Sequence, residues 1–313
     1  MTRMKRSCKQ IFARGTKWFL VALLSIALAL TACSPGGQTP VNYVFDDLGR
    51  LVAINGTPQR IISLAPSNTE ILFALGLGDK VVGVTDYCDY PPEALNKTKV
   101  GGYANPDIEK IVALNPDLIL AGYGNPIEVV YTLAGLGLTV FGIKTTDLDD
   151  LLNDIRRVGE ITDKEVEAQA LTSAMESRIQ AVTNQTEELE QRPRVFYIVW
   201  HDPLWTAGSG TFINELIEKA GGVNIFGNVT GYPMVSIEDV LAHDPEIIIA
   251  SEWSYDWARN ETGPLASTNA SQTGRIYTLD DDLVQRPGPR LVKGLEWFAY
   301  FIHPEIFGEP EGS

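Results

Sequence analysis

Aromatic side chains close to short apolar runs are the residues of this sequence best placed to bind a ligand. Tyr87 and Trp205 follow such runs, and Tyr103 and Tyr232 each precede a helix-like segment that leads into another run. Rings of this kind cover flat or bulky molecules with a large apolar area at a small cost in side-chain entropy. Any one ring would fit a core position equally well, but their recurrence in both halves favours an aromatic binding site.

Tyr103 and Tyr232 also belong to an internal repeat. Residues 102–121 read GYANPDIEKIVALNPDLILA and residues 231–250 read GYPMVSIEDVLAHDPEIIIA, with eight of twenty positions identical at a constant offset of 129. This offset is much longer than the period of a solenoid, which is about 20–50 residues. One copy in each half of the chain therefore predicts two lobes of similar topology that face each other across a cleft.

Each copy of the repeat places a glutamate six residues after its tyrosine, Glu109 in the first copy and Glu238 in the second. An acid in the first turn of a helix interacts favourably with the helix dipole, which is one sufficient reason for both residues. The alternative is functional. A symmetric pair of exposed carboxylates suits docking onto a two-fold symmetric partner that presents arginines.

Motifs that would carry catalysis or metal binding are missing from the sequence. It has no glycine-rich phosphate loop, no G-x-S-x-G nucleophile elbow and no H-E-x-x-H metal-binding helix. Its three histidines, His201, His243 and His303, are scattered without the spacing of metal ligands. We therefore expect a binding protein that is not an enzyme, with no catalytic residue, no resident metal and no cofactor.

Alternating strands and helices would have to position the candidate residues. Short apolar runs bounded by Gly, Pro or Asp are separated by helix-length segments, which predicts an α/β fold with parallel sheets and helices on both faces. The expected strands are residues 60–64, 81–84, 118–121 and 140–143 in the first half, and residues 194–200, 246–250 and 275–279 in the second. Residues 43–54 are expected to form a small leading hairpin.

One long helix is expected between the two groups of strands. Thr162 and Glu165 have the spacing of a capping box, and apolar residues then recur at steps of three and four through residues 168–182. A helix over residues 163–190 would be ~40 Å long at ~1.5 Å per residue. That length would let it run along both lobes, although it would also fit inside one of them.

The N-terminal segment has the features of a lipoprotein signal peptide. Residues 1–32 carry six Lys or Arg and no acid, and residues 18–30 form an uncharged apolar run that is short for a membrane span. The following Leu30-Thr31-Ala32-Cys33 resembles a bacterial lipobox, which implies cleavage before Cys33 and its lipidation. An uncleaved signal anchor is the alternative. Residues 34–40 then read as a flexible tether between a bacterial membrane and the extracytoplasmic domain.

The remainder of the chain is strongly acidic. The formal net charge is −15, and without the six basic residues of the signal segment it becomes −21. Such a surface repels phosphate backbones and anionic lipid, so nucleic acid is not expected as a partner. Cys88 is the one cysteine left after Cys8 and Cys33, so the mature chain has no pair of cysteines for an intramolecular disulfide.

Several longer motifs carry a resemblance to a known family. Residues 60–76 (RIISLAPSNTEILFALG), the DYPP of residues 89–92, the repeat segments and residues 205–226 (WTAGSGTFINELIEKAGGVNIF) resemble the substrate-binding proteins of cobalamin and ferric-siderophore ABC importers. The resemblance spans about residues 58–304 and is closest to the cobalamin-binding member. It implies an extracytoplasmic, membrane-anchored receptor that acts as a monomer and delivers its ligand to the permease dimer of an ABC importer.

The resemblance also implies an architecture. It is that of class III substrate-binding proteins, in which two similar α/β lobes are bridged by one long backbone helix and move only slightly around the ligand. The implied domains are a signal peptide at 1–32, a lipidated tether and leading hairpin at 33–57, an N-terminal lobe at 58–146, a connecting segment with the backbone helix at 147–192, a C-terminal lobe at 193–306 and a tail at 307–313.

Site residues are implied position by position. The residues that fall where the family lines its pocket are Tyr87, Tyr103, Trp205 and Tyr232. Glu109 and Glu238 match the glutamates that dock onto permease arginines. Arg286 falls in the last cleft loop, where it would meet a phosphate or carboxylate of the ligand, or else serve the surface or a helix start. His201 would approach the metal of a bound ligand, or be a hydrogen-bonded loop histidine.

The class of ligand stays open between two alternatives. A corrinoid such as cobalamin (vitamin B12) is the expected ligand, and a ferric siderophore or haem is the alternative on the same scaffold. Tyr103 and Tyr232 stand where the cobalamin receptor has tryptophans, and either of them or His201 would serve as an axial ligand to haem. Anionic siderophores would favour several arginines, and the cleft loops offer mainly Arg286. A lipid-anchored adhesion module would leave the two-lobe repeat unexplained.

Overall fold

The computed structural model describes residues 41–122 and 124–310. Residues 1–40, Tyr123 and residues 311–313 lie outside the described residues, and with them the predicted signal peptide, the Cys33 lipidation site, the tether and the end of the tail. The described residues from Asn42 onward belong to one compact unit. None of the described helices is long and apolar enough to cross a membrane.

A parallel sheet of short apolar strands forms the N-terminal half. Within the described residues its strand order is β5-β4-β3-β6-β7, and each neighbouring pair is parallel. The strands are β3 (Ile61–Ser63), β4 (Val81–Val84), β5 (Thr98–Lys99), β6 (Leu118–Ala121) and β7 (Val140–Gly142). All residues of β3, β6 and β7 are buried. This is expected of a parallel sheet that helices cover on both faces.

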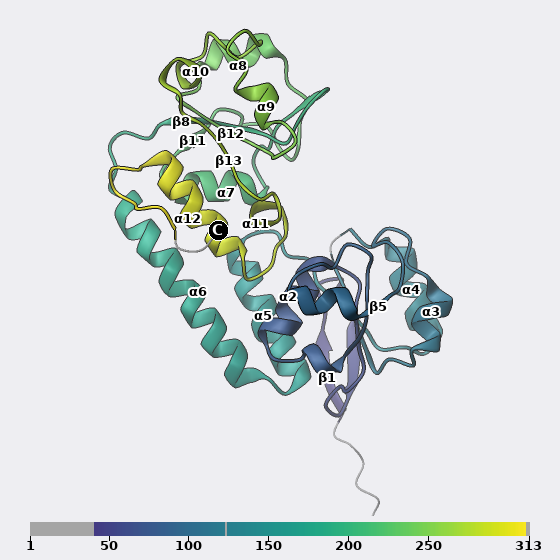
Figure 1. The fold of residues 1–313 in the computed structure, drawn as a ribbon. Coiled ribbons are helices and arrows are strands. Elements are labelled where there is room, and N and C mark those ends of the chain that lie inside the picture. The colour runs from purple at the N-terminus through teal and green to yellow at the C-terminus, as the bar shows by residue number, and fades with distance from the viewer. Residues whose placement is uncertain (1–40, 123, 311–313) are drawn as a thin grey trace, which may run out of the picture. The chain divides into compact units, whose positions relative to one another are not determined.

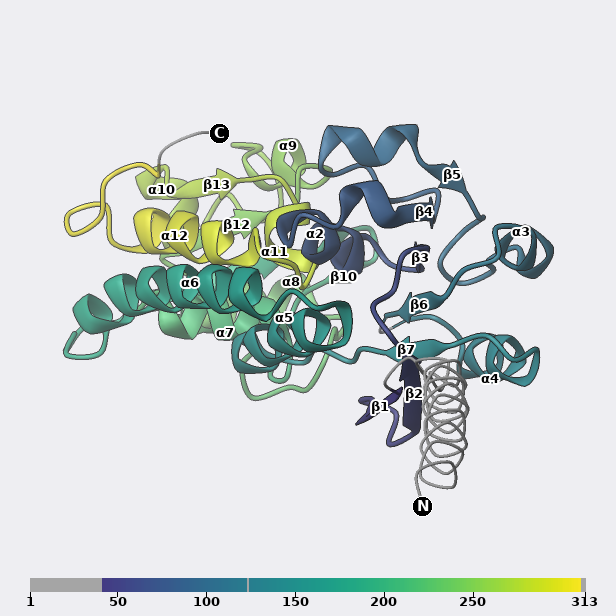
Figure 2. The same cartoon turned by 90° about the horizontal axis from the view of Figure 1, so that it is seen from below.

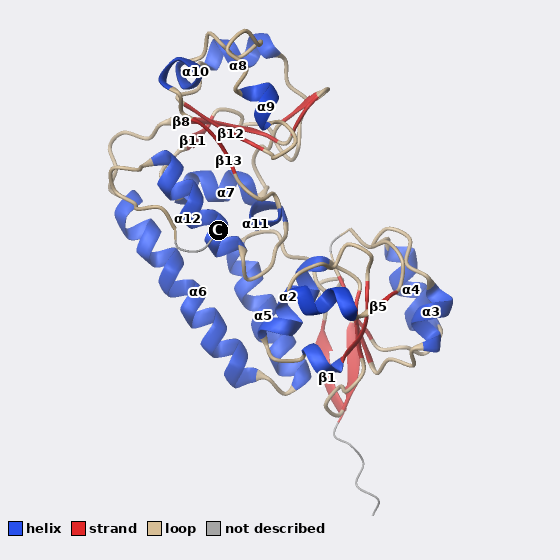
Figure 3. Cartoon of the chain, viewed as in Figure 1, coloured by secondary structure: helices blue, strands red, loops and turns tan. Residues whose placement is uncertain are grey.

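A second parallel sheet, with the strand order β11-β8-β12-β13 in the described residues, forms the C-terminal half (Figure 3). Its strands are β8 (Arg194–Ile198), β11 (Val223–Asn224), β12 (Ile247–Ala250) and β13 (Ile276–Thr278). Two small two-stranded sheets pair β1 (Val41–Phe45) with β2 (Leu51–Asn55), and β9 (Trp200–His201) with β10 (Leu204–Trp205).

The predicted α/β class, the central strands and the leading hairpin are confirmed. Each strand expected from an apolar run is present, usually one or two residues shorter than predicted, and residues 194–200 divide into β8 and the start of β9. The edge strands β5 and β11 were not predicted, because two residues are too few to show a hydrophobic period.

Helices cover both faces of each sheet (Figures 1 and 3). In the N-terminal half they are α2 (Pro66–Ala74), α3 (Ile108–Ala113) and α4 (Ile127–Gly135), with the 3₁₀ turns η1 (Gly78–Lys80) and η2 (Pro92–Asn96). In the C-terminal half they are α7 (Phe212–Lys219), α8 (Ile237–His243), α9 (Tyr255–Ala258), α10 (Asn269–Thr273), α11 (Asp282–Gln285) and α12 (Leu291–Ile302).

Two helices, rather than one, connect the sheets. α5 (Leu148–Thr162) ends at Asp163, which adopts a left-handed conformation with φ of 60°, and α6 (Glu165–Thr186) begins two residues later. The predicted capping box is wrong, because Thr162 is the last residue of α5 and its hydroxyl donates to a carbonyl of that helix at 2.6 Å. Lys164 precedes α6 instead, without a side-chain cap.

The long helix itself is close to the prediction. α6 has 22 residues, which corresponds to ~33 Å at ~1.5 Å per residue. Ala168, Met175 and Val182 are buried, and Leu171 and Ile179 pack against the same core. The helix packs against α5, α7 and α12, and both views show it running alongside α12 and α5 (Figures 1 and 2). It therefore contacts the connecting helix as well as the helices of the C-terminal half.

One apolar core is shared by the inner faces of both sheets. It contains Phe141 of β7, Leu151 of α5, Met175 of α6, Tyr197 of β8 and Phe298 of α12, all of them buried. Two smaller cores lie on the outer faces, one under α3 and α4 and the other under α8, α9 and α10. The two halves are therefore joined by packed side chains. The exact domain boundaries within the chain stay a prediction.

The two copies of the repeat occupy equivalent places in separate sheets. α3 precedes β6, which lies between β3 and β7, and α8 precedes β12, which lies between β8 and β13. In each copy the residue before the repeat proline, Asn115 or Asp244, adopts the left-handed conformation, with φ of 46° and 42°. Ser236 caps α8 by accepting from the Asp239 backbone N–H at 3.0 Å.

Candidate ligand-binding site

A cavity of about 710 Å³ lies at the carboxyl ends of the strands of both sheets. This is where ligands bind in open α/β sheets. Its wall consists of residues 65–68 before and in α2, Tyr87, Tyr103, Gly122, Gly124, residues 143–146, residues 210–212, Gly231, Tyr232 and residues 285–287. A cavity of this volume is within the range of small-molecule sites, which is about 300–1,000 Å³.

Three of the four predicted pocket aromatics meet in this cavity. Tyr87, Tyr103 and Tyr232 are 57%, 41% and 47% exposed, so their rings are available for contact. Tyr87 and Tyr103 lie edge to face, with ring centroids 5.9 Å apart and an interplanar angle of 73°. Tyr232 is contributed by the other half of the chain. The structure therefore brings the repeat tyrosines to one shared space.

Local backbone geometry holds Tyr103 in the wall. The Asn125 amide Nδ2 donates to the Tyr103 carbonyl at 2.7 Å and to the Leu64 carbonyl at 2.9 Å, and its Oδ1 accepts from the Gly122 N–H. Gly124 has φ of 101°, and a Cβ there would lie 2.9 Å from the Tyr103 ring. Only glycine fits this position without displacing the ring.

Arg286 lines the cavity but is already paired with acids. Its guanidinium lies 2.5 Å from an Asp89 carboxylate oxygen and 2.8 Å from an Asp282 oxygen. The hydrogen bond from Arg286 holds the pKa of Asp89 below its ordinary value. An anionic ligand would therefore have to compete with both carboxylates for the Arg286 guanidinium.

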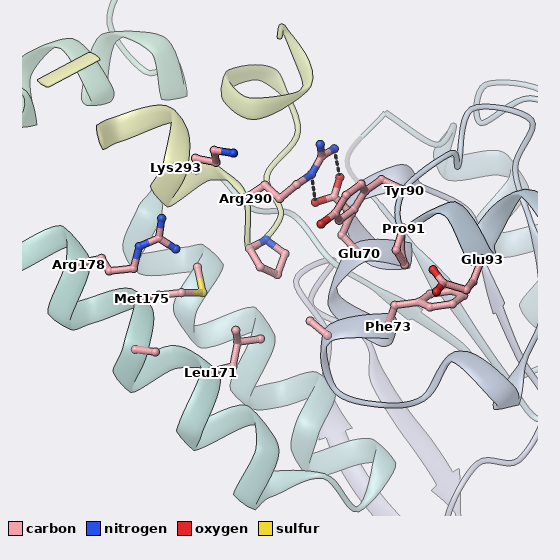
Figure 4. Close-up of a pocket in the computed structure, with 13 residues that line it drawn as sticks. Glu70, Phe73, Tyr90, Pro91, Glu93, Leu171, Met175, Arg178, Arg290 and Lys293 are labelled. Carbon is pink, nitrogen blue, oxygen red and sulfur yellow. Dashed lines mark hydrogen bonds and ion pairs between the residues drawn. The ribbon is translucent and has the colours of Figure 1, made fainter. Parts of the chain in front are cut away.

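A buried ion pair lies behind this cluster and joins the two halves (Figure 4). Arg290, just before α12, donates from Nε and Nη2 to the Glu70 carboxylate of α2 at 3.0 and 2.7 Å, and its guanidinium lies 3.9 Å from the centre of the Tyr90 ring. The Glu70 side chain is 2% exposed. Burial raises the pKa of Glu70, and the hydrogen bond from Arg290 opposes that rise. A second cavity, of about 540 Å³, lies beside this pair between α2, α6 and α12.

Trp205 and His201 are not part of the wall that the described residues form around the first cavity. Trp205 pairs with Trp200 across the β9–β10 ribbon. The His201 ring is stacked between Trp200 and Trp257, at 5.2 and 5.4 Å between centroids, and its Nδ1 lies 3.1 Å from the Ser254 hydroxyl. The local contacts of His201 are those of a hydrogen-bonded loop histidine. A role for either residue in binding stays a prediction.

Glu109 and Glu238 lie in the first turns of α3 and α8 and are exposed. Each follows a capped helix start, with Asp107 accepting from the Lys110 N–H in the first copy and Ser236 capping the second. The two carboxylates are therefore equivalent in their helices, which is compatible with both the structural and the docking explanation.

Several residues of the wall were not predicted from the sequence. Residues 143–146 and Phe212 line the cavity, and so does Asn68 in the first turn of α2. The rule that ligands lie beyond strand carboxyl ends would have found residues 143–146, which follow β7 directly. Within the described residues no group of three or more His, Cys, Asp or Glu side chains is arranged to hold a metal ion. Cys88 is a buried free thiol, 3.1 Å from the Thr69 and Thr85 hydroxyls.

Comparison with protein families places this fold and cavity in a known class. Residues 61–283 match the model of the periplasmic binding protein family, and the chain belongs to that family. It is 33% identical to the ABC transporter substrate-binding lipoprotein YvrC of Bacillus subtilis over 307 residues, which cover 92% of this chain and 97% of the relative. The chain is thus a substrate-binding protein of the ABC transporter type with the class III fold.

Two further similarities concern proteins with named ligands. The vitamin B12-binding protein of Vibrio cholerae is 36% identical over 246 residues, which cover 78% of this chain and 89% of that protein. The crystal structure of the periplasmic vitamin B12-binding protein BtuF of Vibrio cholerae matches with a TM-score of 0.72 at 35% identity, and the match covers 79% of this chain and 97% of that chain. The periplasmic haem-binding protein RhuT of Roseiflexus matches with a TM-score of 0.71 at 26% identity, over 80% of this chain and 99% of that chain.

Replacing Arg290 with methionine should destabilise the protein strongly. The change removes both hydrogen bonds to the buried Glu70 carboxylate and leaves it only the more distant Arg286 guanidinium, at 4.0 Å, among the described ion pairs. Removing one partner of a buried ion pair typically costs about 3–5 kcal/mol in the free energy of unfolding. The matched control is Arg178→Met, which breaks the ion pair to Glu296 at a side chain that is 45% exposed, where a loss of only ~0–1 kcal/mol is expected. Chemical denaturation at pH 7 measures both.

The pH dependence provides a second check on the Arg290→Met variant. Because burial favours the protonated form of Glu70, the deficit should shrink as the pH falls below the raised pKa of Glu70 in the folded state. Equal losses in the two variants, or a deficit that grows in acid, would show that the buried pair does not join the halves as described.

Proposed function

We propose that this chain binds a corrinoid, cobalamin or a close relative, in the cavity between its sheets and delivers it to an ABC importer. The observation that carries the proposal is the cavity wall, where tyrosines from both halves meet in a chain related to vitamin B12-binding proteins. A corrin ring is large, flat and largely apolar on its faces, and aromatic walls suit such a surface. Binding free energy would come mainly from desolvation, at ~25 cal/mol per Å² before the costs of association.

The ion pairs of Arg286 weaken its attraction for an anionic group of a ligand. Arg286 already has Asp89 and Asp282 as partners, so a phosphate or carboxylate would have to compete with two nearby acids. A ferric siderophore or haem remains the second candidate, and the likeness to a haem-binding protein favours it. For haem, the proposed axial ligands in the cavity are Tyr103 and Tyr232.

Isothermal titration of the protein with cyanocobalamin, haemin and a panel of ferric siderophores tests this proposal directly. Changing Tyr103 and Tyr232 together to alanine should weaken cyanocobalamin binding more than tenfold, because the double change removes the aromatic contacts from both halves. Tyr131→Ala is the matched control, since Tyr131 is 56% exposed on α4 and away from the cavity wall. If the double variant binds cyanocobalamin with undiminished affinity, the assignment of the binding site is wrong.

We also propose that Glu109 and Glu238 dock onto arginines of the permease. They are exposed, equivalent in the two halves and separate from the cavity wall. An equivalent acid on each half suits a partner with two-fold symmetry. The functional role of the protein is then binding and delivery, with no catalytic step, no cofactor and no nucleic acid, and with a monomer as the working form.

Reversing the charge of both glutamates separates delivery from binding. Glu109→Arg with Glu238→Arg should leave cyanocobalamin affinity unchanged and abolish uptake by cells that carry the cognate importer, because like charges would face each other at the docking surface. Glu128→Arg, an exposed acid in the first turn of α4, serves as the control and should retain uptake. Uptake that survives the double reversal would contradict the docking role.

Anchoring through a lipid on Cys33 completes the proposal. The lipobox-like Leu30-Thr31-Ala32-Cys33 and the named lipoprotein relative support it. Cys33→Ala should block lipidation, because no thiol is then available at that position. The full chain should lose metabolic labelling with a radioactive fatty acid, whereas Cys88→Ala should keep it. Labelling that persists in the Cys33 variant would contradict the assignment.

A further inference from the structure

The side-chain amide of Asn68, a residue of the cavity wall, is buried without a hydrogen-bond partner among the described residues. Asn68 lies in the first turn of α2, is 1% exposed and lines the cavity, yet neither Oδ1 nor Nδ2 of its side chain has a hydrogen-bond partner among the described residues. Most buried side-chain amides are fully paired, and an unpaired one costs free energy in the folded state. An unpaired amide at the edge of a ligand cavity therefore calls for a functional explanation.

Several polar groups near Asn68 are engaged with one another or with the backbone. The Ser63 hydroxyl donates to the Ala65 carbonyl at 2.9 Å, and the Thr69 hydroxyl donates to Ser63 Oγ at 2.8 Å. Asn125, the other amide nearby, uses both ends of its side chain on the backbone. None of these hydrogen bonds involves Asn68.

Space beside the Asn68 amide is kept open by glycine. A Cβ on Gly122, which follows β6 directly and also lines the cavity, would lie 3.5 Å from Asn68 Nδ2 and 2.6 Å from the Ala65 Cβ. A Cβ at this position would clash with Ala65, just before α2, and would lie in van der Waals contact with the amide. The absence of a side chain at residue 122 leaves the amide next to the cavity.

The chemistry of the missing partner follows from the amide itself. Nδ2 needs an acceptor and Oδ1 needs a donor, and the two atoms lie side by side on one planar group. A primary carboxamide offers this complementary pair in one group. An ionised carboxylate offers acceptors alone and would leave Oδ1 unpaired. The periphery of a corrin ring carries primary carboxamides, whereas haem carries two carboxylates.

We propose that Asn68 pairs through both side-chain atoms with a peripheral carboxamide of the ligand and so selects corrinoids over carboxylate-bearing tetrapyrroles. This inference rests on the proposed function. It adds the residue that forms hydrogen bonds with the periphery of the ligand, while the tyrosines cover the faces of the ring. Since the amide is nearly covered in the unliganded cavity, ligand entry includes a small local shift of the wall around it. A site that pairs a ligand group rejects analogues that leave its own polar atoms unpaired.

Two substitutions test the pairing by isothermal titration with cyanocobalamin. Asn68→Leu has nearly the same shape and cannot pair, so affinity should fall at least tenfold while the thermal stability of the unliganded protein is unchanged or higher. Asn68→Asp keeps the acceptor and loses the donor at neutral pH, so affinity should fall there and recover in part as acid protonates the carboxyl. Asn96→Asp, an exposed residue at the end of η2, controls for the added charge and should bind as the parent does.

A ligand series separates this inference from the proposed function. The ligands are cobalamin derivatives in which one peripheral carboxamide is hydrolysed to a carboxylate. The parent protein should bind at least one of these isomers tenfold more weakly than cyanocobalamin. Asn68→Leu should lose that discrimination. If the parent binds cyanocobalamin and both Asn68 variants bind it equally well, the pairing is wrong and the function stands. If the parent does not bind cyanocobalamin at all, both fail. A lower stability of Asn68→Leu together with unchanged discrimination would assign Asn68 a structural role and overturn the inference.

Discussion

The apolar core that the two sheets share is the constraint on which the rest of the structure depends. The inner face of each sheet packs against α5, α6, α7 or α12, and the side chains between them form one continuous cluster. Protein interiors are close-packed, so halves joined in this way move relative to each other only if that packing is disrupted. The cavity at the strand ends is therefore largely formed before a ligand arrives, which reduces the ordering cost of binding.

Charge is arranged around that core so that the two arginines near the cavity are paired with acids. The body of the chain is strongly acidic, yet the two arginines closest to the cavity are matched by carboxylates from both halves, Arg286 by Asp89 and Asp282 and Arg290 by Glu70. A buried carboxylate such as Glu70 is tolerated because a guanidinium satisfies both of its oxygens. The ion pairs thus add a second connection between the halves.

The limits of prediction from sequence can be seen at particular residues. The repeat predicted two equivalent sheets because its tyrosine, glutamate, proline and apolar strand recur at one offset, and the structure places α3–β6 and α8–β12 equivalently. The start of α6 was misplaced because Thr162 and Glu165 have capping-box spacing, but the left-handed turn at Asp163 ends α5 between them. The resemblance implied His201 and Trp205 as site residues, and both lie on the β9–β10 ribbon outside the wall of the first cavity, so their role in binding stays a prediction.

The same ribbon shows why the cavity is less symmetric than the repeat. In the N-terminal half α2 follows β3 after only two residues, so the first turn of α2 reaches the cavity with Asn68. The lack of hydrogen-bond partners for the Asn68 amide depends on its folded surroundings and could not be predicted from the sequence. In the C-terminal half the β9–β10 ribbon stands between β8 and α7, and residues 210–212 occupy the corresponding edge. A two-fold symmetric permease would meet equivalent glutamates on both halves, while a ligand without that symmetry would meet a different wall on each side. One duplicated scaffold thereby combines a symmetric outer surface with an asymmetric cavity, which can hold such a ligand in a single orientation.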